Sequence, residues 1–353
     1  MAQIAATAVG FPRNYYSQEE LLTLLTRIWS KRLVKYEVLE RFHRNVTVRG
    51  RYMALPIEEY ERLDGFHSRN LAWIQTALDL GEQVVCSVLE RARLLPQQIA
   101  HLAFTTVTGI AVPSIDARLM NRIPFPAGLK RTPLFGLGCV GGAAGIARVA
   151  DYLKGHPDEA AILLSVELCS LTLQQDDLSI ENLIATGLFG DGAAAVLLVG
   201  DEHPLADQGK ARVVDSQSIF FPSTEHIMGW DVRDTGFKIV LSPDVSEVAQ
   251  VHLRPAVEAF LRPHGLEIDD IGCWISHPGG PKVIDGIENG LGLDSEALQI
   301  SRDTLARVGN LSSASVLLVL QETLAKRQPA PGTYGVLMAM GPAFCAELVL
   351  LRW

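Results

Sequence analysis

The segment Pro133-Leu-Phe-Gly-Leu-Gly-Cys139-Val-Gly-Gly-Ala-Ala-Gly-Ile-Ala147 has the pattern of a β-strand that turns sharply into an α-helix. The residue at such a turn, here Cys139, lies at the helix N-terminus, where the positive end of the helix dipole stabilises a thiolate. The surrounding glycines let the backbone pass close to a bulky substrate. The alternative is a buried, unreactive cysteine packed by small neighbours, which is a common state of free cysteine.

Apolar runs on both sides of this segment predict the remaining elements of the first half. Ser17 and Glu20 form a capping box that opens a helix. Apolar residues at helical spacing predict another helix from about 68 to 95. Continuous apolar or β-rich runs predict buried strands at residues 2–9, 101–108, 161–167 and 192–199.

A second unit follows a polar stretch that begins near residue 200. Both halves mix apolar strands with helices, which indicates an α/β protein with buried sheets. We therefore divide the chain into residues 1–210 and 211–353. The second unit is predicted to contain helices near 246–263, 281–291 and 310–327, and strands at 273–276, 333–340 and 344–352.

The composition disfavours several classes of protein. The chain has 353 residues, 48% of them hydrophobic, and a formal net charge of -9, which makes nucleic acid an unexpected partner. No stretch approaches the roughly 20 apolar residues that span a bilayer, and the first residues do not resemble a signal peptide. The cysteines are widely spaced and form no C-x-x-C motif: Cys86, Cys139, Cys169, Cys273 and Cys345. We expect neither disulfides nor a metal site, and a cytoplasmic location.

One basic cluster stands out against this acidic background. We interpret this cluster as a solvated helix face or as a surface that binds phosphate groups. Its members are Lys31, Arg32, Lys35, Arg41, Arg44, Arg49 and Arg51.

A histidine in a loop motif is the second candidate for chemistry. The run Ile275-Ser-His277-Pro-Gly-Gly-Pro281 places His277 at the end of an apolar strand and before a Gly/Pro loop. Such a side chain projects from a sheet edge into a cleft. The alternative is a histidine whose ring is hydrogen-bonded by loop carbonyls.

An asparagine at a helix start is the third candidate. Asn310 in Gly309-Asn-Leu-Ser-Ser-Ala-Ser315 opens an apolar helix. Asparagine is a preferred N-cap, so capping is the alternative explanation.

Together, Cys139, His277 and Asn310 fit decarboxylative Claisen condensation. A thiolate carries an acyl chain as a thioester. Malonyl-CoA then loses CO2 and leaves an enolate, whose charge an imidazole N–H and an amide N–H stabilise. We expect His277 also to pair with Cys139 and lower its pKa. This chemistry requires no cofactor.

The chain resembles the type III polyketide synthases, the chalcone synthase family. The three blocks above occur in the same order and at similar separations in that family. Further matches are Arg51-Tyr-Met53, Thr105–Gly109 with Pro113, and Leu188-Phe-Gly-Asp-Gly-Ala-Ala-Ala195. The resemblance covers essentially the whole chain. It implies a thiolase-like αβαβα five-layered sandwich of two similar halves, a homodimer, and acyl-CoA and malonyl-CoA as substrates.

The resemblance also implies roles for individual side chains. Cys139 becomes the nucleophile, and His277 and Asn310 the donors. Arg41 and Lys282 are assigned to CoA binding, although Val38 and Asn45 replace two basic residues of the family's phosphate site. Residues expected to contact substrate are Phe189, Thr172, Thr108, Ser312, Ile239 and Trp230.

Two departures from the family's pattern concern the product. Ile239 replaces an aromatic gatekeeper, and the run from Met228 to Val240 resembles bacterial alkylpyrone and alkylresorcinol synthases. The loop Ala339-Met-Gly-Pro-Ala343 replaces a glycine-rich loop. We expect a medium- or long-chain fatty acyl-CoA starter and closure to an alkylpyrone.

Other functions remain open. One alternative is a ketoacyl-carrier-protein synthase III, which performs a single condensation. Another is a chalcone- or phloroglucinol-type synthase with a short or aromatic starter. A chain-length factor would lack the nucleophile, and a thiolase would need a second cysteine in the site.

Overall fold

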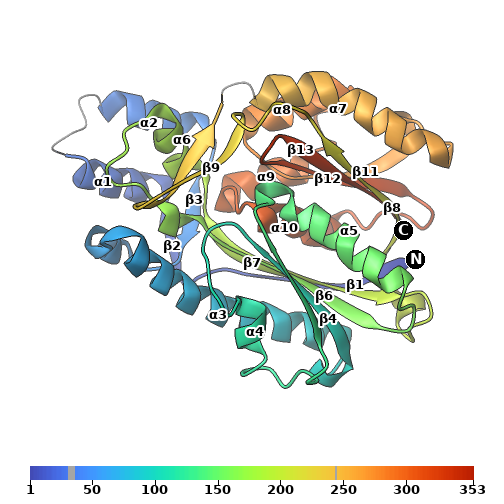
Figure 1. Ribbon diagram of the computed structural model, residues 1–353. Helices are drawn as coiled ribbons and strands as arrows, with labels where there is room; N and C mark the ends of the chain where they lie inside the picture. The colour runs from blue at the N-terminus through green and yellow to red at the C-terminus, as the bar shows by residue number, and fades with distance from the viewer. Residues whose placement is uncertain (31–35, 243–244) are drawn as a thin grey trace.

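The computed structural model describes residues 1–30, 36–242 and 245–353. Five layers of helices and sheets alternate, as the prediction of an αβαβα sandwich requires (Figure 1). The elements up to residue 200 are β1 (Ala2–Gly10), β2 (Asn14–Ser17), α1 (Gln18–Ile28), α2 (Tyr36–Asn45), β3 (Gly50–Met53), α3 (Gly65–Ala92), β4 (Ile99–Thr106), α4 (Ile115–Leu119), β5 (Lys130–Phe135), α5 (Gly141–Lys154), β6 (Ala160–Leu168), α6 (Ile180–Leu188) and β7 (Asp191–Gly200).

The later elements repeat much of this order. They are β8 (Ala211–Phe220), β9 (Met228–Arg233), β10 (Gly236–Leu241), α7 (Val245–Leu261), β11 (Ile271–Ser276), α8 (Pro281–Leu291), α9 (Gln299–Val308), α10 (Ser313–Lys326), β12 (Tyr334–Gly341) and β13 (Cys345–Arg352).

Nine strands of the described residues follow one continuous order, β11-β12-β13-β8-β1-β7-β6-β4-β5, whereas β2 pairs with β3 and β9 with β10 in separate two-stranded sheets. The two halves of this order meet through three paired residues of β1 and β8, between Ala2 and Ile4 on one side and Ala211 and Val213 on the other. In the first half β5, β4 and β6 are parallel, and β7 and β1 continue antiparallel. In the second half β11 and β12 are parallel, and β13 and β8 continue antiparallel. The two halves therefore share a strand arrangement, and we propose residue 210, just before β8, as their boundary.

Apolar side chains fill the spaces between the layers. The helices α5 and α10 lie between the two sheets and contribute residues such as Ile146 and Leu317 to the central core. Helix α3 covers the outer face of the first sheet, and α7 and α8 cover that of the second. Strands β6 and β7 are buried along their whole length. Their continuous apolar sequences follow from this burial on both faces.

Most predicted elements are confirmed within a few residues. The capping box at α1 is formed by Ser17 and Glu20. The helix predicted from residue 310 begins at Ser313 instead, so Asn310 precedes it. The sequence analysis did not anticipate the two-stranded sheet of β9 and β10, which is separate from the large sheets.

Candidate active site

The three residues singled out for chemistry line one cavity of about 350 Å³. Cys139 lies in a short 3₁₀ turn, Gly138–Val140, between β5 and α5. His277 follows the last residue of β11, and Asn310 lies between α9 and α10. The fold thus brings Cys139 together with two segments that follow it by more than 100 residues in the chain.

Cys139 is placed by close backbone packing. Gly138 has a φ of +54°, and a Cβ there would come within 2.6 Å of Pro342. A Cβ on Gly141 would come within 2.6 Å of the Thr105 hydroxyl. The turn can therefore approach β4 and the loop after β12 only with glycine at these positions.

The charge state of Cys139 differs from the prediction. Its thiol donates a hydrogen bond to the Ser312 hydroxyl across 3.7 Å. Burial raises the pKa of Cys139 to about 12, although contacts with Ser312 and Asn310 oppose that shift. The predicted lowering of the pKa by His277 is therefore wrong, because desolvation outweighs the polar contacts.

His277 has a ring that is ready to interact with a ligand. Its backbone N–H donates to the Met338 carbonyl across 2.9 Å, which fixes the residue at the sheet edge. The ring is buried, and neither ring nitrogen has a partner within the described residues. The alternative in which loop carbonyls hydrogen-bond the ring is thus wrong. Burial lowers the pKa of His277 to about 3, so the neutral imidazole offers one N–H donor and one acceptor.

Asn310 has a fixed orientation. Its Oδ1 accepts hydrogen bonds from the Ser312 N–H at 2.8 Å and from the Ser315 hydroxyl at 3.4 Å. Its Nδ2 donates to the Gly279 carbonyl across 3.2 Å, in the loop that follows His277. The amide oxygen therefore faces the start of α10, and the NH2 group faces the loop and the cavity. Asn310 is not the N-cap residue of α10, because Ser312 occupies that position.

Several predicted substrate contacts are found in the cavity wall. Phe189, Trp230, Ile239, Ser312 and Lys282 all line the 350 Å³ cavity. Phe189 follows the end of α6, and its neighbour Gly190 donates a backbone hydrogen bond to the Asn310 carbonyl. The wall is thus connected directly to the segment that carries Asn310.

Two predicted wall residues lie elsewhere. Thr172 lines a second cavity of about 60 Å³, which shares Cys169, Phe189, Trp230 and Ile239 with the larger cavity. Thr108 does not line the large cavity. Its hydroxyl donates to the Glu167 carboxylate at 2.9 Å and accepts from the Leu168 N–H at 2.9 Å. These two contacts hold Thr108 behind the wall.

The predicted CoA-binding side chains are exposed at different places. Lys282 lies in the first turn of α8 and lines the cavity. Arg41 is exposed on α2, and its guanidinium lies 5.7 Å from the ring of Phe42, which lines the cavity. The predicted basic cluster is not a single surface, because Arg51 is 2% exposed. Its members Lys31, Arg32 and Lys35 lie outside the described residues.

Sequence reasoning missed a buried carboxyl group beside the site. Glu167 accepts hydrogen bonds from the Val107 N–H at 3.1 Å and from the hydroxyls of Thr106, Thr108 and Ser313. Burial raises the pKa of Glu167 to about 7 despite these donors. A usable signal was an ionisable residue at the carboxyl end of an otherwise apolar strand.

A second cysteine was also missed. Cys169 lines both cavities. Burial raises its pKa well above the usual range, so it is present as a thiol. The argument against a thiolase from the lack of a second cysteine in the site is therefore wrong.

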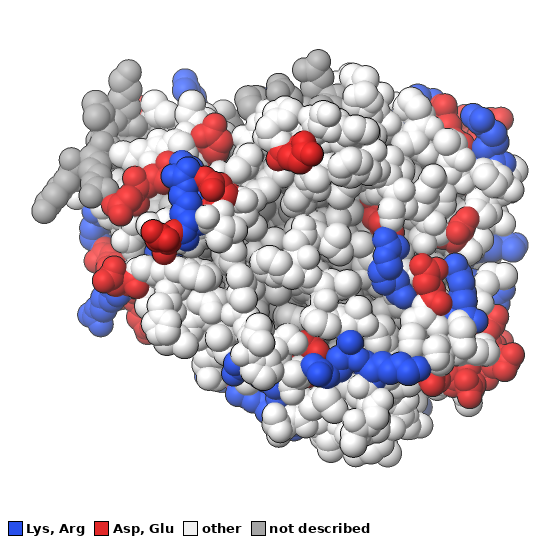
Figure 2. All heavy atoms as spheres, viewed as in Figure 1, with Lys and Arg blue, Asp and Glu red and all other residues white. Residues whose placement is uncertain are grey.

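The described residues also bear on the expected partners. They contain no group of three or more His, Cys, Asp or Glu side chains placed to hold a metal ion. No helix in the described ranges has the length and apolarity needed to cross a bilayer. On the face shown in Figure 2, Lys and Arg lie interspersed with Asp and Glu.

Comparisons with known proteins extend over the whole chain. A family model for the N-terminal domain of chalcone and stilbene synthases matches residues 1–202, and one for the C-terminal domain matches residues 212–353. 1,3,6,8-Tetrahydroxynaphthalene synthase of Streptomyces peucetius subsp. caesius is 47% identical over 350 residues, which cover 99% of this chain and 93% of the relative. Phloroglucinol synthase of Pseudomonas fluorescens is 29% identical over 357 residues, covering 100% and 99% of the two chains.

A solved structure shows the same architecture. The crystal structure of 1,3,6,8-tetrahydroxynaphthalene synthase from Streptomyces coelicolor A3(2), a bacterial type III polyketide synthase, superposes with a TM-score of 0.93. The two sequences are 31% identical, and the match covers 99% of each chain.

Proposed function

The chain belongs to the chalcone and stilbene synthase family of type III polyketide synthases, and we propose that Cys139, His277 and Asn310 carry its condensation reaction. Enzymes of this family perform Claisen condensations on CoA thioesters without a metal or organic cofactor. The observation that supports this assignment is the convergence of the three side chains on one buried cavity. The match to the family models, rather than the three side chains, sets aside a carrier-protein ketosynthase, a thiolase and a chain-length factor.

In the proposed reaction Cys139 first receives the starter. Its thiol passes a proton to His277, and the thiolate attacks the thioester carbonyl of the starter. The bond from carbonyl carbon to CoA sulfur breaks, and CoA leaves as a thiol with the proton held by His277. The starter is then bound to Sγ of Cys139 as a thioester.

The proposed extension step uses the neutral side chains of His277 and Asn310 as hydrogen-bond donors. Malonyl-CoA loses CO2, and the electron pair of the broken C–C bond moves onto the thioester oxygen as an enolate. The N–H groups of His277 and Asn310 stabilise this charge. The enolate carbon attacks the acyl group on Cys139, a C–C bond forms, and the thiolate leaves. Transfer of the longer chain back to Cys139 begins the next cycle.

We propose malonyl-CoA as both starter and extender, with an aromatic product of the tetrahydroxynaphthalene type. The support is the 47% identity, over 99% of this chain, to a relative named for that product. A fatty acyl-CoA starter and an alkylpyrone product form a second candidate. The observation favouring it is the 60 Å³ cavity beyond Ile239 and Trp230, which leucine residues of α1 line in part.

One incubation distinguishes these functions. Purified protein receives malonyl-CoA alone, or malonyl-CoA with acyl-CoA starters of about six to sixteen carbons, without carrier protein. A naphthalene product from malonyl-CoA alone supports the first candidate. Alkylpyrones that form only with acyl-CoA support the second. Condensation that requires malonyl carried on a protein would contradict both.

We further propose a homodimer that forms through the β5 edge. Strand β5 ends the strand order, and almost all of its residues are exposed. Phe135, at the end of β5, is 55% exposed and pairs with Thr106, the last residue of β4, after which the chain continues to the exposed Ile110 and Val112. An open edge beside apolar side chains favours a second copy of the chain.

The oligomeric state tests this proposal. Light scattering is expected to give a dimer for the wild type and a monomer for Phe135→Asp. Phe220→Asp, an exposed phenylalanine on β8, serves as the control and is expected to stay dimeric. A monomeric wild type would contradict the proposal. We also propose the cytoplasm as the location and Arg41 and Lys282 as contacts for CoA.

A further inference from the structure

A hairpin that belongs to neither large sheet forms one wall of the cavity. Strands β9 and β10 pair with each other from Met228 to Leu241. Six of their residues line the 350 Å³ cavity: Met228, Gly229, Trp230, Ile239, Val240 and Leu241. A two-stranded hairpin alone is at best marginally stable in water. Its position must therefore come from contacts with the rest of the protein.

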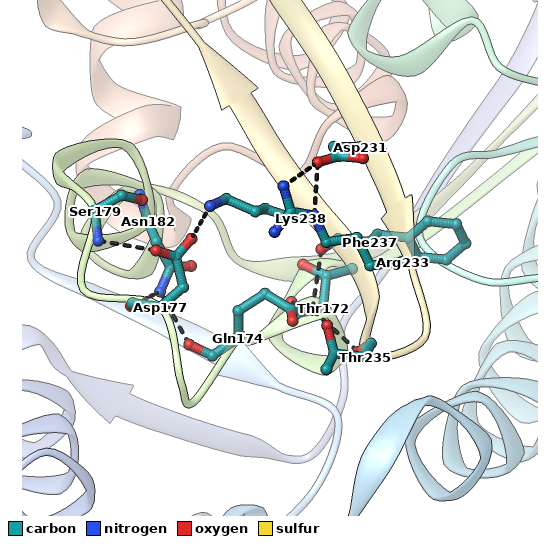
Figure 3. A network of polar contacts seen from close by, with 10 residues as sticks. All are labelled: Thr172, Gln174, Asp177, Ser179, Asn182, Asp231, Arg233, Thr235, Phe237 and Lys238. Carbon is teal, nitrogen blue, oxygen red and sulfur yellow. Dashed lines mark hydrogen bonds and ion pairs between the residues drawn. The ribbon is translucent and has the colours of Figure 1, made fainter.

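A buried glutamine makes two of these contacts (Figure 3). The side-chain amide of Gln174 donates to the carbonyls of Phe237 at 3.2 Å, Thr235 at 3.3 Å and Thr172 at 3.3 Å. Two of these carbonyls belong to the hairpin, and the third belongs to a residue that lines the 60 Å³ cavity. Gln174 is 6% exposed and lines neither of the two cavities.

The segment that carries Gln174 is itself anchored to α6. The buried side chain of Asn182, in the first turn of α6, donates to the carbonyls of Gln174 at 3.1 Å and Asp177 at 2.7 Å. Asp177 also forms an ion pair with Lys238 of β10, at 3.2 Å. Figure 3 shows these groups as one network between the α6 segment and the hairpin. Phe189 of the cavity wall follows the other end of α6.

The hairpin carries two of the four residues that line both cavities. Trp230 and Ile239 are paired across β9 and β10, and both line both cavities. The Trp230 indole donates to the Val107 carbonyl at 3.0 Å, and its ring lies 6.0 Å from that of Phe237. Movement of the backbone at Phe237 would therefore move the partition between the cavities.

We propose that Gln174 is a positioning residue that fixes the β9–β10 hairpin and thereby sets how long a polyketide chain the cavity accommodates. This proposal rests on the proposed polyketide synthase function. A chain that no longer fits its wall is released early as a shorter lactone. Gln174 touches neither the nucleophile nor the proposed donors, so its loss should change which product forms more than whether Cys139 is loaded.

The test compares Gln174→Met with the neighbouring Gln175→Met. Both changes remove an amide of similar size, but the Gln175 amide donates to the Tyr60 carbonyl at 2.8 Å, outside the hairpin. Hydrogen exchange of residues 228–241 is expected to accelerate about three- to tenfold in Gln174→Met and to stay unchanged in Gln175→Met. The ratio of shortened to full-length products should rise by a similar factor in Gln174→Met alone, while acyl loading of Cys139 stays near wild type.

Two results would overturn the proposal. The first is unchanged exchange of the hairpin in Gln174→Met. The second is a ratio of shortened to full-length products in Gln174→Met equal to that of wild type, together with a loss of thermal stability equal to that of Gln175→Met. Lys238→Met removes the partly exposed ion pair with Asp177. It should raise the hydrogen-exchange rate of the hairpin and the ratio of shortened products, but less than Gln174→Met does. If Gln174→Met does not fold, Lys238→Met is tested in its place. A wild type that makes no polyketide would refute the proposed function, whereas hydrogen exchange would still decide the role of Gln174.

Discussion

Replacing Asn310 by aspartate removes a hydrogen-bond donor while nearly preserving the shape of the side chain. The remaining oxygen can still accept from the Ser312 N–H and the Ser315 hydroxyl, so the start of α10 keeps its contacts. The lost NH2 group is the one that donates to the Gly279 carbonyl and faces the cavity. Asn310→Asp keeps an acceptor for the buried Ser312 N–H, which Asn310→Ala would remove, but an ionised aspartate also adds a negative charge that opposes the thiolate and the enolate.

The expected magnitude differs between the two steps of the reaction. Removing one donor from a developing oxyanion typically costs about 2.7–4 kcal/mol, which corresponds to a loss of about 10²–10³ in the rate of decarboxylation. Loading of Cys139 should fall less. There Asn310 contributes one contact that lowers the pKa of the thiol, and an ordinary hydrogen bond contributes about 0.5–1.5 kcal/mol. We therefore expect at most about a tenfold loss in loading.

Two measurements separate these effects. CO2 release from carboxyl-labelled malonyl-CoA gives the decarboxylation rate, and intact-protein mass spectrometry gives the rate of acyl transfer to Cys139. Ser315→Ala is the matched control, because Ser315 touches the oxygen of Asn310 and leaves its NH2 group in place. If Asn310→Asp released CO2 at the wild-type rate, or lost loading and decarboxylation by the same factor, the donor role would be refuted.

Three further predictions follow from the site. Cys139→Ala is expected to abolish polyketide formation and the acyl adduct while retaining some malonyl-CoA decarboxylation; an acyl adduct on another cysteine would contradict the assignment. Thr172→Trp should shorten the accepted starters or reduce the number of extensions, because Thr172 lines the 60 Å³ cavity, and an unchanged product spectrum would count against that cavity as a chain site. Glu167 has a pKa raised from 4.5 to about 7, so the folded state binds the additional proton and stability should fall as pH rises from about 4.5 to 7, by up to about 3 kcal/mol. Chemical denaturation across this pH range should show a smaller fall in the free energy of unfolding for Glu167→Gln than for wild type. If the free energy of unfolding fell equally with pH in both proteins, the raised pKa of Glu167 would be contradicted.

Local sequence signals were sufficient for most of the layers. The sequence predicts the capping box of Ser17 and Glu20 and the apolar strands β6 and β7. Caps and continuous apolar strands depend on neighbouring residues, so a local pattern is enough to predict them. The three proposed catalytic residues, Cys139, His277 and Asn310, were likewise found in short sequence motifs. Their convergence on one cavity was an expectation from resemblance to a family, since no local pattern encodes contacts across the two halves.

Features set by long-range packing could not be read in this way. The hydroxyl of Thr108 is turned away from the large cavity by Glu167 and Leu168, which follow it by about 60 residues. The role of the β9–β10 hairpin depends on Gln174, whose partners lie about 60 residues later. The pKa of Cys139 was predicted with the wrong sign, because the helix N-terminus is a local feature whereas burial is a property of the folded protein.

The opposite pKa shifts of Cys139 and His277 have one cause and different consequences for the two steps. Burial raises the pKa of the thiol and lowers that of the imidazole, so both groups are neutral in the buried cavity. In the proposed reaction, loading requires a thiolate, and passing the thiol proton to His277 would keep the total charge of the cavity unchanged while creating an attractive ion pair. The proposed extension requires the reverse, because once Cys139 carries the chain, a neutral imidazole would donate its N–H to the enolate. Burial therefore hinders the proposed loading and favours the proposed decarboxylation. The contacts of Ser312 and Asn310 with Cys139 lower the pKa of the thiol, so they favour loading, the step that burial hinders.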